Sequence, residues 1–214
     1  MSSPSSPLLV DLGSTLFAPK QTEPCRRWEE YAQVFLWDNG SLMAKADIPD
    51  DDWNAAELRM LSHMTQGQHI GYVLGIFDAE VCNGGVAQFL FNRGHLAEEA
   101  LGACDKLNLP HLKALLKDVL ASLNRKSLLE AQQVGAEEVA KSGDGSISSR
   151  AFEFYERERL AIEPAAQQLE REYIPVYDGD RLVAAEGPLR VAMCEALNAY
   201  VEAHPSEFQI VTAQ

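Results

Sequence analysis

Four polar side chains recur at helical spacing after residue 87, and their types could support acid–base chemistry. They follow the i, i+4, i+7, i+11 pattern of one helical face. One interpretation is a small-ligand or enzymatic site in which the carboxylate orients the histidine. The other makes the two carboxamides ties to backbone groups at a nearby double glycine, because buried polar groups must be paired. We favour the second, since carboxamides are poor catalysts, and it places the histidine and glutamate at the surface. The stripe consists of Gln88, Asn92, His95 and Glu99.

The double glycine just before the stripe would position it. Gly84 and Gly85 accept positive φ without penalty, which favours a sharp junction between two helices. Asn83 precedes them and can cap the exposed helix end with its side chain. The sequence therefore predicts a helix, a tight turn and a second helix that carries the polar stripe. The predicted structural motif is Asn83, Gly84, Gly85, Gln88, Phe89 and Asn92.

The pattern Glu-Val-x-Asn-Gly-Gly-x-x-Gln-Phe-x-x-Asn at residues 80–92 resembles the signature of a bacterial family of acidic DNA-mimic proteins. The likeness extends more loosely over residues 52–175. Val86 and Cys82 depart from the family pattern, which usually has Phe and Asn there. The resemblance implies a helical homodimer that occupies the DNA-binding surface of a transcription factor. The motif specifies the fold, whereas mimicry depends on the distribution of surface carboxylates.

Charge limits the partners of this chain. Its 214 residues include 32 acidic and 18 basic side chains, a formal net charge of −14. This balance disfavours direct nucleic-acid binding and anionic membrane surfaces, and it permits a basic or DNA-binding protein as partner. Acidity that serves only solubility is the plainer alternative. The sequence has no run of about 18 apolar residues and no signal-peptide pattern at its start, so we expect a cytoplasmic protein without membrane contact.

A DNA mimic needs rows of carboxylates with few basic residues between them, because duplex DNA presents a charge about every 1.7 Å of its axis. Residues 150–173 fit poorly, since their glutamates alternate with arginines as on a solvated, salt-bridged face. Residues 47–57 and 98–105 fit better. The candidate acidic interaction surface is Asp47, Asp50, Asp51, Asp52, Glu57, Glu98, Glu99 and Asp105.

Other chemistry has little support in the sequence. The histidines lack metal-ligand spacing and the four cysteines form no C-x-x-C pair, so we predict no metal site and no cofactor. No nucleophile motif is present, and we assign no catalytic residue. The cysteines are predicted to be buried free thiols rather than disulfides. Cys82 beside the glycines has a minor alternative as a thiol with a lowered pKa.

Apolar periodicity predicts a mainly α protein, a compact helical bundle of one domain. An N-terminal arm over residues 1–24, rich in proline and serine, precedes a helical domain over residues 25–214. A short hairpin is predicted near residues 174–184. The sequence thus predicts a non-enzymatic acidic interaction domain that binds and inhibits a DNA-binding protein such as a transcription regulator. A helical adaptor for one specific basic target is an alternative that sequence cannot separate from it.

Overall fold

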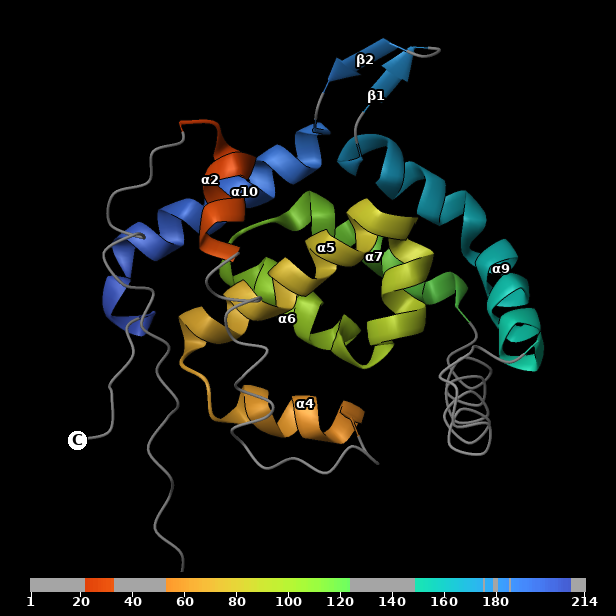
Figure 1. Ribbon diagram of the computed structural model, residues 1–214, viewed down its shortest axis with the longest axis horizontal. Helices are drawn as coiled ribbons and strands as arrows, with labels where there is room; N and C mark the ends of the chain where they lie inside the picture. The colour runs from red at the N-terminus through yellow and green to blue at the C-terminus, as the bar shows by residue number, and fades with distance from the viewer. Residues whose placement is uncertain are drawn as a thin grey trace, which may run out of the picture.

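The computed structural model describes residues 22–32, 53–123, 149–174, 176–178, 181–184 and 186–208, and it is mainly α-helical as predicted (Figure 1). Residues 1–21 of the predicted arm and the acidic residues Asp47, Asp50, Asp51 and Asp52 lie outside the described residues. Among the described residues, helices pack around one long central element, α5.

The central helix α5 spans Gln66–Arg93 and follows α4, Trp53–Ser62. The chain turns between these two helices at residues 63–65. Thr65 accepts a hydrogen bond from the backbone N–H of Gln68, whose side chain accepts one from the Thr65 N–H. This reciprocal pair of hydrogen bonds is a capping box. It stabilises the start of α5 because it satisfies two backbone donors at the helix N-terminus.

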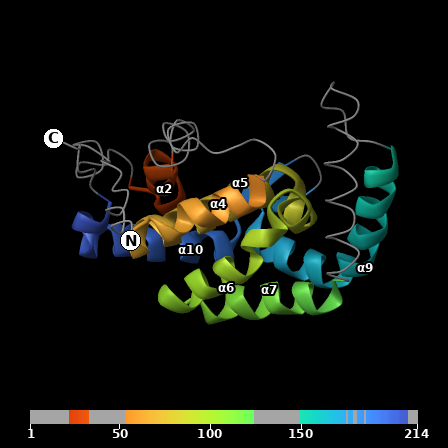
Figure 2. The same ribbon diagram turned by 90° about the horizontal axis from the view of Figure 1, so that it is seen from below.

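Three further helices follow α5, of which α6 and α9 pack directly on it. The turn η3 (Gly94–Leu96) leads into α6 (Ala97–Lys106) and then α7 (Pro110–Ser122), which lie along the same side of the molecule (Figure 2). The long α9 spans Ser149–Tyr173 and packs on both α7 and α5.

Aromatic rings fill the centre. Phe77 contacts Phe89 and Tyr173 edge to face, with ring centroids 5.1 and 5.4 Å apart. All three side chains are buried. The contacts join both halves of α5 to α9, since edge-to-face aromatic pairs add to the stabilisation from burial.

The C-terminal part confirms one prediction. The predicted hairpin forms from β1 (Val176–Asp178) and β2 (Arg181–Ala184), which pair antiparallel. Next, α10 spans Pro188–Ala203 and is followed by the turn η4 (Pro205–Glu207). The first described helix, α2 (Pro24–Ala32), lies across α10. Thus the earliest described segment packs on the last helix.

Candidate functional site

The predicted junction at the double glycine is present inside α5. Gly84 has φ −153° and ψ 19°, and Gly85 has φ 82° and ψ 176°, so the chain leaves helical geometry for two residues. The second half-helix begins with Val86, whose backbone N–H donates to Glu170 Oε1 at 2.8 Å. A Cβ at Gly85 would clash with this carboxylate, and its φ is one that L side chains rarely adopt. Gly85 is therefore required by the backbone geometry, and a Cβ there would displace the Glu170 carboxylate.

The two carboxamides of the stripe bind a carboxylate on the other side of the junction. Gln88 Nε2 and Asn92 Nδ2 donate to the same oxygen, Glu80 Oε2, at 2.8 and 2.9 Å. The prediction that these carboxamides bind backbone groups is therefore wrong, because their common partner is the Glu80 carboxylate. An ionised carboxylate is a stronger acceptor than a carbonyl group, and Glu80 lies within reach because the kink folds the two half-helices together. Asn83, the predicted cap, is exposed.

His95 and Glu57, both predicted at the surface, meet in the interior. Glu57 of α4 is fully buried and cannot belong to an exposed acidic surface. His95 Nε2 lies 2.5 Å from Glu57 Oε2, and its side chain is only 9% exposed. Tyr72 donates its hydroxyl to Glu57 Oε1 at 2.5 Å, and Arg93 Nη1 lies 3.4 Å from Oε2. Three donors from α5 and η3 thus hold one carboxylate of α4.

The environment of Glu57 favours its charged form. Burial would raise the pKa of this carboxyl, but hydrogen bonds from His95 and Tyr72 and the charge of Arg93 outweigh it, and the pKa is lowered from 4.5. The pKa of Tyr72 is raised by burial and by the adjacent carboxylate, so its hydroxyl stays a donor. The cluster therefore keeps Glu57 charged and the Tyr72 hydroxyl protonated, and it has little exposed surface on which a substrate could bind.

A second buried carboxylate, Asp78, was not predicted. Arg190 Nε and Nη2 donate to its two oxygens at 2.7 and 3.0 Å, and Tyr173 donates to Oδ1 at 2.8 Å. Burial and the Asp78 charge raise the pKa of Tyr173. Asp78 thus joins α5 to α9 and α10. The sequence feature that could have indicated a buried Asp78 is its position directly after Phe77, in an apolar stretch of α5.

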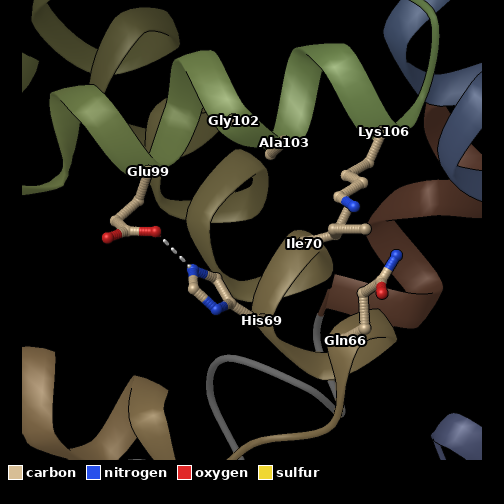
Figure 3. A pocket seen from close by; sticks show the side chains of 7 residues that line it. All are labelled: Gln66, His69, Ile70, Glu99, Gly102, Ala103 and Lys106. Carbon is tan, nitrogen blue, oxygen red and sulfur yellow. Dashed lines mark ion pairs between the residues drawn. The ribbon is translucent and has the colours of Figure 1, made fainter.

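Glu99 does not orient His95, as one interpretation required, but pairs with His69. Glu99 Oε2 lies 3.0 Å from His69 Nε2, at one end of a small open pocket between α5 and α6 (Figure 3). Ile70 and Ala103 supply apolar lining, and Lys106 lies farther along α6. The pocket has a volume of about 160 Å³. The four side chains of the predicted stripe therefore divide among three separate contacts.

The rest of the candidate acidic surface is mixed in charge. Glu98 and Asp105 are exposed on α6, and Glu99 is partly exposed. Asp105 pairs with Lys113 of α7. The exposed acidic and lysine side chains of α6 and α7, which we call the α6–α7 face, are Glu98, Asp105, Lys106, Lys117 and Asp118.

All four cysteines are free, and three are buried as predicted. Cys82 is instead exposed, and its thiol lies 3.6 Å from Asp78 Oδ1. Partial desolvation of the thiol and the Asp78 charge raise the pKa of Cys82 to about 12. The minor alternative, a lowered pKa, is therefore wrong. Within the described residues, no cluster of His, Cys, Asp and Glu has the composition to hold a metal ion, and no helix could span a membrane.

Comparison with known proteins places this fold in a family. The sequence profile described as DMP19-like protein matches residues 62–204, more than half of the chain. The chain belongs to the DMP19-like family. The match begins later than predicted and continues past residue 175 through α10, so α2 and all but the last residue of α4 precede the DMP19-like segment. No curated protein and no solved structure gives a significant match.

Proposed function

We propose that this protein is an acidic interaction protein that mimics DNA and occupies the DNA-binding surface of a basic protein such as a transcription regulator. Membership of the DMP19-like family is the observation that carries the proposal. The net charge of −14 supports it, because a negative protein attracts basic surfaces and is repelled by DNA itself. Within residues 62–204 the sequence holds 21 acidic and 13 basic residues.

A non-enzymatic role agrees with the contacts of the polar groups. Gln88 and Asn92 are committed to Glu80, and His95 to the buried Glu57. Groups held this way reinforce helix contacts, because the amide groups of Gln88 and Asn92 and the Nε2 atom of His95 are engaged within the protein. These contacts support a binding role over acid–base catalysis.

The surface that we propose for the partner combines two acidic segments. Asp47, Asp50, Asp51 and Asp52 precede α4 in the sequence, and Glu98 and Asp105 are exposed on α6. Lys106 and Lys117 dilute the charge on the α6–α7 face. A homodimer would add the equivalent residues of a second copy, and a DNA-binding partner implies a location in the cytoplasm.

Competition with DNA tests the proposal. The immobilised full chain is incubated with a lysate of the source cells, and bound proteins are eluted by a salt gradient or by excess duplex DNA. We expect basic DNA-binding proteins that both treatments release, since charge pairing at exposed surfaces weakens with ionic strength. Recovery of only neutral or acidic proteins, or retention that ignores salt and DNA, would contradict the proposal.

Two matched double variants on the α6–α7 face sharpen the test. Glu98→Gln with Asp105→Asn removes two negative charges, and Lys106→Gln with Lys117→Gln removes two positive charges. Mimicry predicts opposite effects: the first variant should bind the recovered partner more weakly and the second more tightly. Equal effects of the two variants would show that this face does not present charge to the partner.

The pocket beside His69 and Glu99 gives a second candidate function, the binding of a small ligand. Gly102 lines it, and a Cβ at this position would meet no atom within 4 Å. Gly102→Leu should therefore fill the pocket without disturbing the helix. If DNA-competed binding persists in Gly102→Leu while a thermal shift by a small molecule is lost, the pocket serves a separate ligand.

A further inference from the structure

Two buried cysteines lie where α2 crosses α10. Cys25 is 1% exposed and Cys194 fully buried, and both thiols are free. A hydrogen bond to Cys25, together with burial, raises the pKa of Cys194. Both residues belong to one core cluster at the contact between α2 and α10, although they are far apart in the sequence.

Flanking contacts fix this arrangement. Arg190, Cys194 and Asn198 are spaced by four residues and lie on one face of α10. Arg190 Nη2 donates to Glu29 Oε1 at 3.0 Å, and Asn198 Nδ2 donates to the backbone carbonyl of Pro24 at 2.9 Å. These two bonds lie one helical turn before and one turn after Cys194. They join this face of α10 to the first residue and to the middle of α2. The thiol contact is thus set by how the helices pack.

We propose that Cys25 and Cys194 form a reversible disulfide that fastens α2 to the DMP19-like segment. Cys25 precedes residues 62–204, the segment matched by the family, and Cys194 lies within it. The bond would therefore join an added helix to the family domain. Closing a loop of this length restricts the unfolded chain strongly, which is the main source of stabilisation in the loop-entropy description.

The oxidant that we propose is hydrogen peroxide. The closed pair is unreactive, because a buried thiol with a raised pKa supplies little thiolate. Local opening of the nine-residue α2 exposes Cys25, whose thiolate attacks one peroxide oxygen. A sulfur–oxygen bond forms, the oxygen–oxygen bond breaks, and hydroxide leaves and is protonated to water.

Redocking of α2 completes the reaction. The Cys194 sulfur attacks the sulfur of the Cys25 sulfenic acid, so that the disulfide forms and the sulfur–oxygen bond breaks. The departing hydroxide takes the Cys194 proton and leaves as water. In total the two thiols lose two protons and two electrons, and one peroxide becomes two molecules of water.

Peptide mapping tests the proposal on the folded full chain. After treatment with hydrogen peroxide and blocking of free thiols, a Cys25–Cys194 linked peptide should appear, lighter by two hydrogen atoms than its two parts. Dithiothreitol should reverse it, and the oxidised protein should melt about 5 °C or more above the reduced form. The link should persist in Cys82→Ser and in Cys104→Ser, and be lost in Cys25→Ala and Cys194→Ala.

A different linkage would overturn the inference. Bridges to Cys82 or Cys104, or oxidation of Cys82 without any Cys25–Cys194 link, contradict it. Asn198→Ala supplies a second test, because loss of the bond to Pro24 should let α2 open more often and increase the rate of linking severalfold. An unchanged or slower rate would show that opening of α2 does not control the reaction.

Discussion

The carboxylates around α5 and those on the α6–α7 face have the same chemistry and opposite surroundings. Glu57 and Asp78 are buried, and Glu80 is 16% exposed at its side chain. Each of these three, which we call the inner carboxylates, accepts hydrogen bonds from at least two side chains. Glu98 and Asp105 are exposed, and Asp105 pairs with Lys113. The number of acidic residues therefore does not measure the negative charge at the surface, because some of these residues lie inside the protein and hold helices together.

The two groups should respond differently to mutation. A charge that loses its partner inside a protein is left in a medium that solvates it poorly, whereas an exposed charge is hydrated and screened. Removing a partner of an inner carboxylate should therefore lower stability, and changing the α6–α7 face should alter binding. The following predictions test this contrast, beginning with the largest effect.

Arg190→Met should be the most damaging substitution. It removes two of the donors to buried Asp78 and leaves that carboxylate with Tyr173 and the weak thiol donor of Cys82. Breaking a buried ion pair by removing one partner costs about 3–5 kcal/mol in the free energy of unfolding. Urea denaturation followed by circular dichroism measures it.

The matched control is Arg190→Met together with Asp78→Leu, which removes both charges. Replacing a buried pair by apolar groups is often close to neutral, so this double variant should regain stability relative to the single one. A single variant as stable as the parent would show that Asp78 is not a fastening point.

Gly85→Ala should cost about 1–3 kcal/mol, because a left-handed φ is strained in alanine and its Cβ would meet Glu170. Gly102→Ala is the control, since this glycine lies within helix α6 with open space around it. There alanine should stabilise the protein by up to about 1 kcal/mol. Equal effects at both positions, measured by thermal unfolding, would contradict a strained junction.

Glu57→Gln should destabilise the protein by about 1–3 kcal/mol at neutral pH, because Arg93 and His95 lose an ionised acceptor. The pKa of Glu57 is lowered in the folded protein. Its contribution to stability is therefore complete above the ordinary value of 4.5 and is lost as pH falls below it. Denaturation of both proteins from pH 7 to pH 3 should show their difference shrinking in the acid range. A constant difference would contradict the lowered pKa.

Gln88→Ala should have a smaller effect, about 1 kcal/mol, since Asn92 still donates to Glu80. Gln88→Ala combined with Asn92→Ala should cost more than the sum of the two single variants, because only the double variant leaves Glu80 without both carboxamides. Strict additivity in a double-mutant cycle would show that the two carboxamides do not share one acceptor.

Local patterns predicted the elements of the fold better than the partners of its polar groups. Pro188 begins α10 and Pro205 follows its end, because proline suits a first helical turn and disrupts a continuing helix. The junction at Gly84 and Gly85 was also predicted from the sequence, because few residue pairs other than two glycines permit such a turn.

Long-range contacts could not be predicted. Glu57 pairs with His95 across 38 positions and Asp78 with Arg190 across 112, and no helical periodicity encodes such distances. Glu57 was placed at the surface because acidic residues are mostly exposed. The partners are set by how the kinked α5 brings α4, η3 and α10 together, which only the assembled fold reveals.

The most direct test of the account is a paired measurement of stability and partner affinity on Glu98→Gln/Asp105→Asn and on Glu57→Gln. We predict that the first protein unfolds within about 0.5 kcal/mol of the parent and binds the DNA-competed partner more weakly, with a shallower salt dependence. Glu57→Gln should lose stability, and its folded fraction should bind with the affinity of the parent. Unchanged affinity in the first protein, together with weakened binding by folded Glu57→Gln, would contradict the division between inner carboxylates and a charged binding surface.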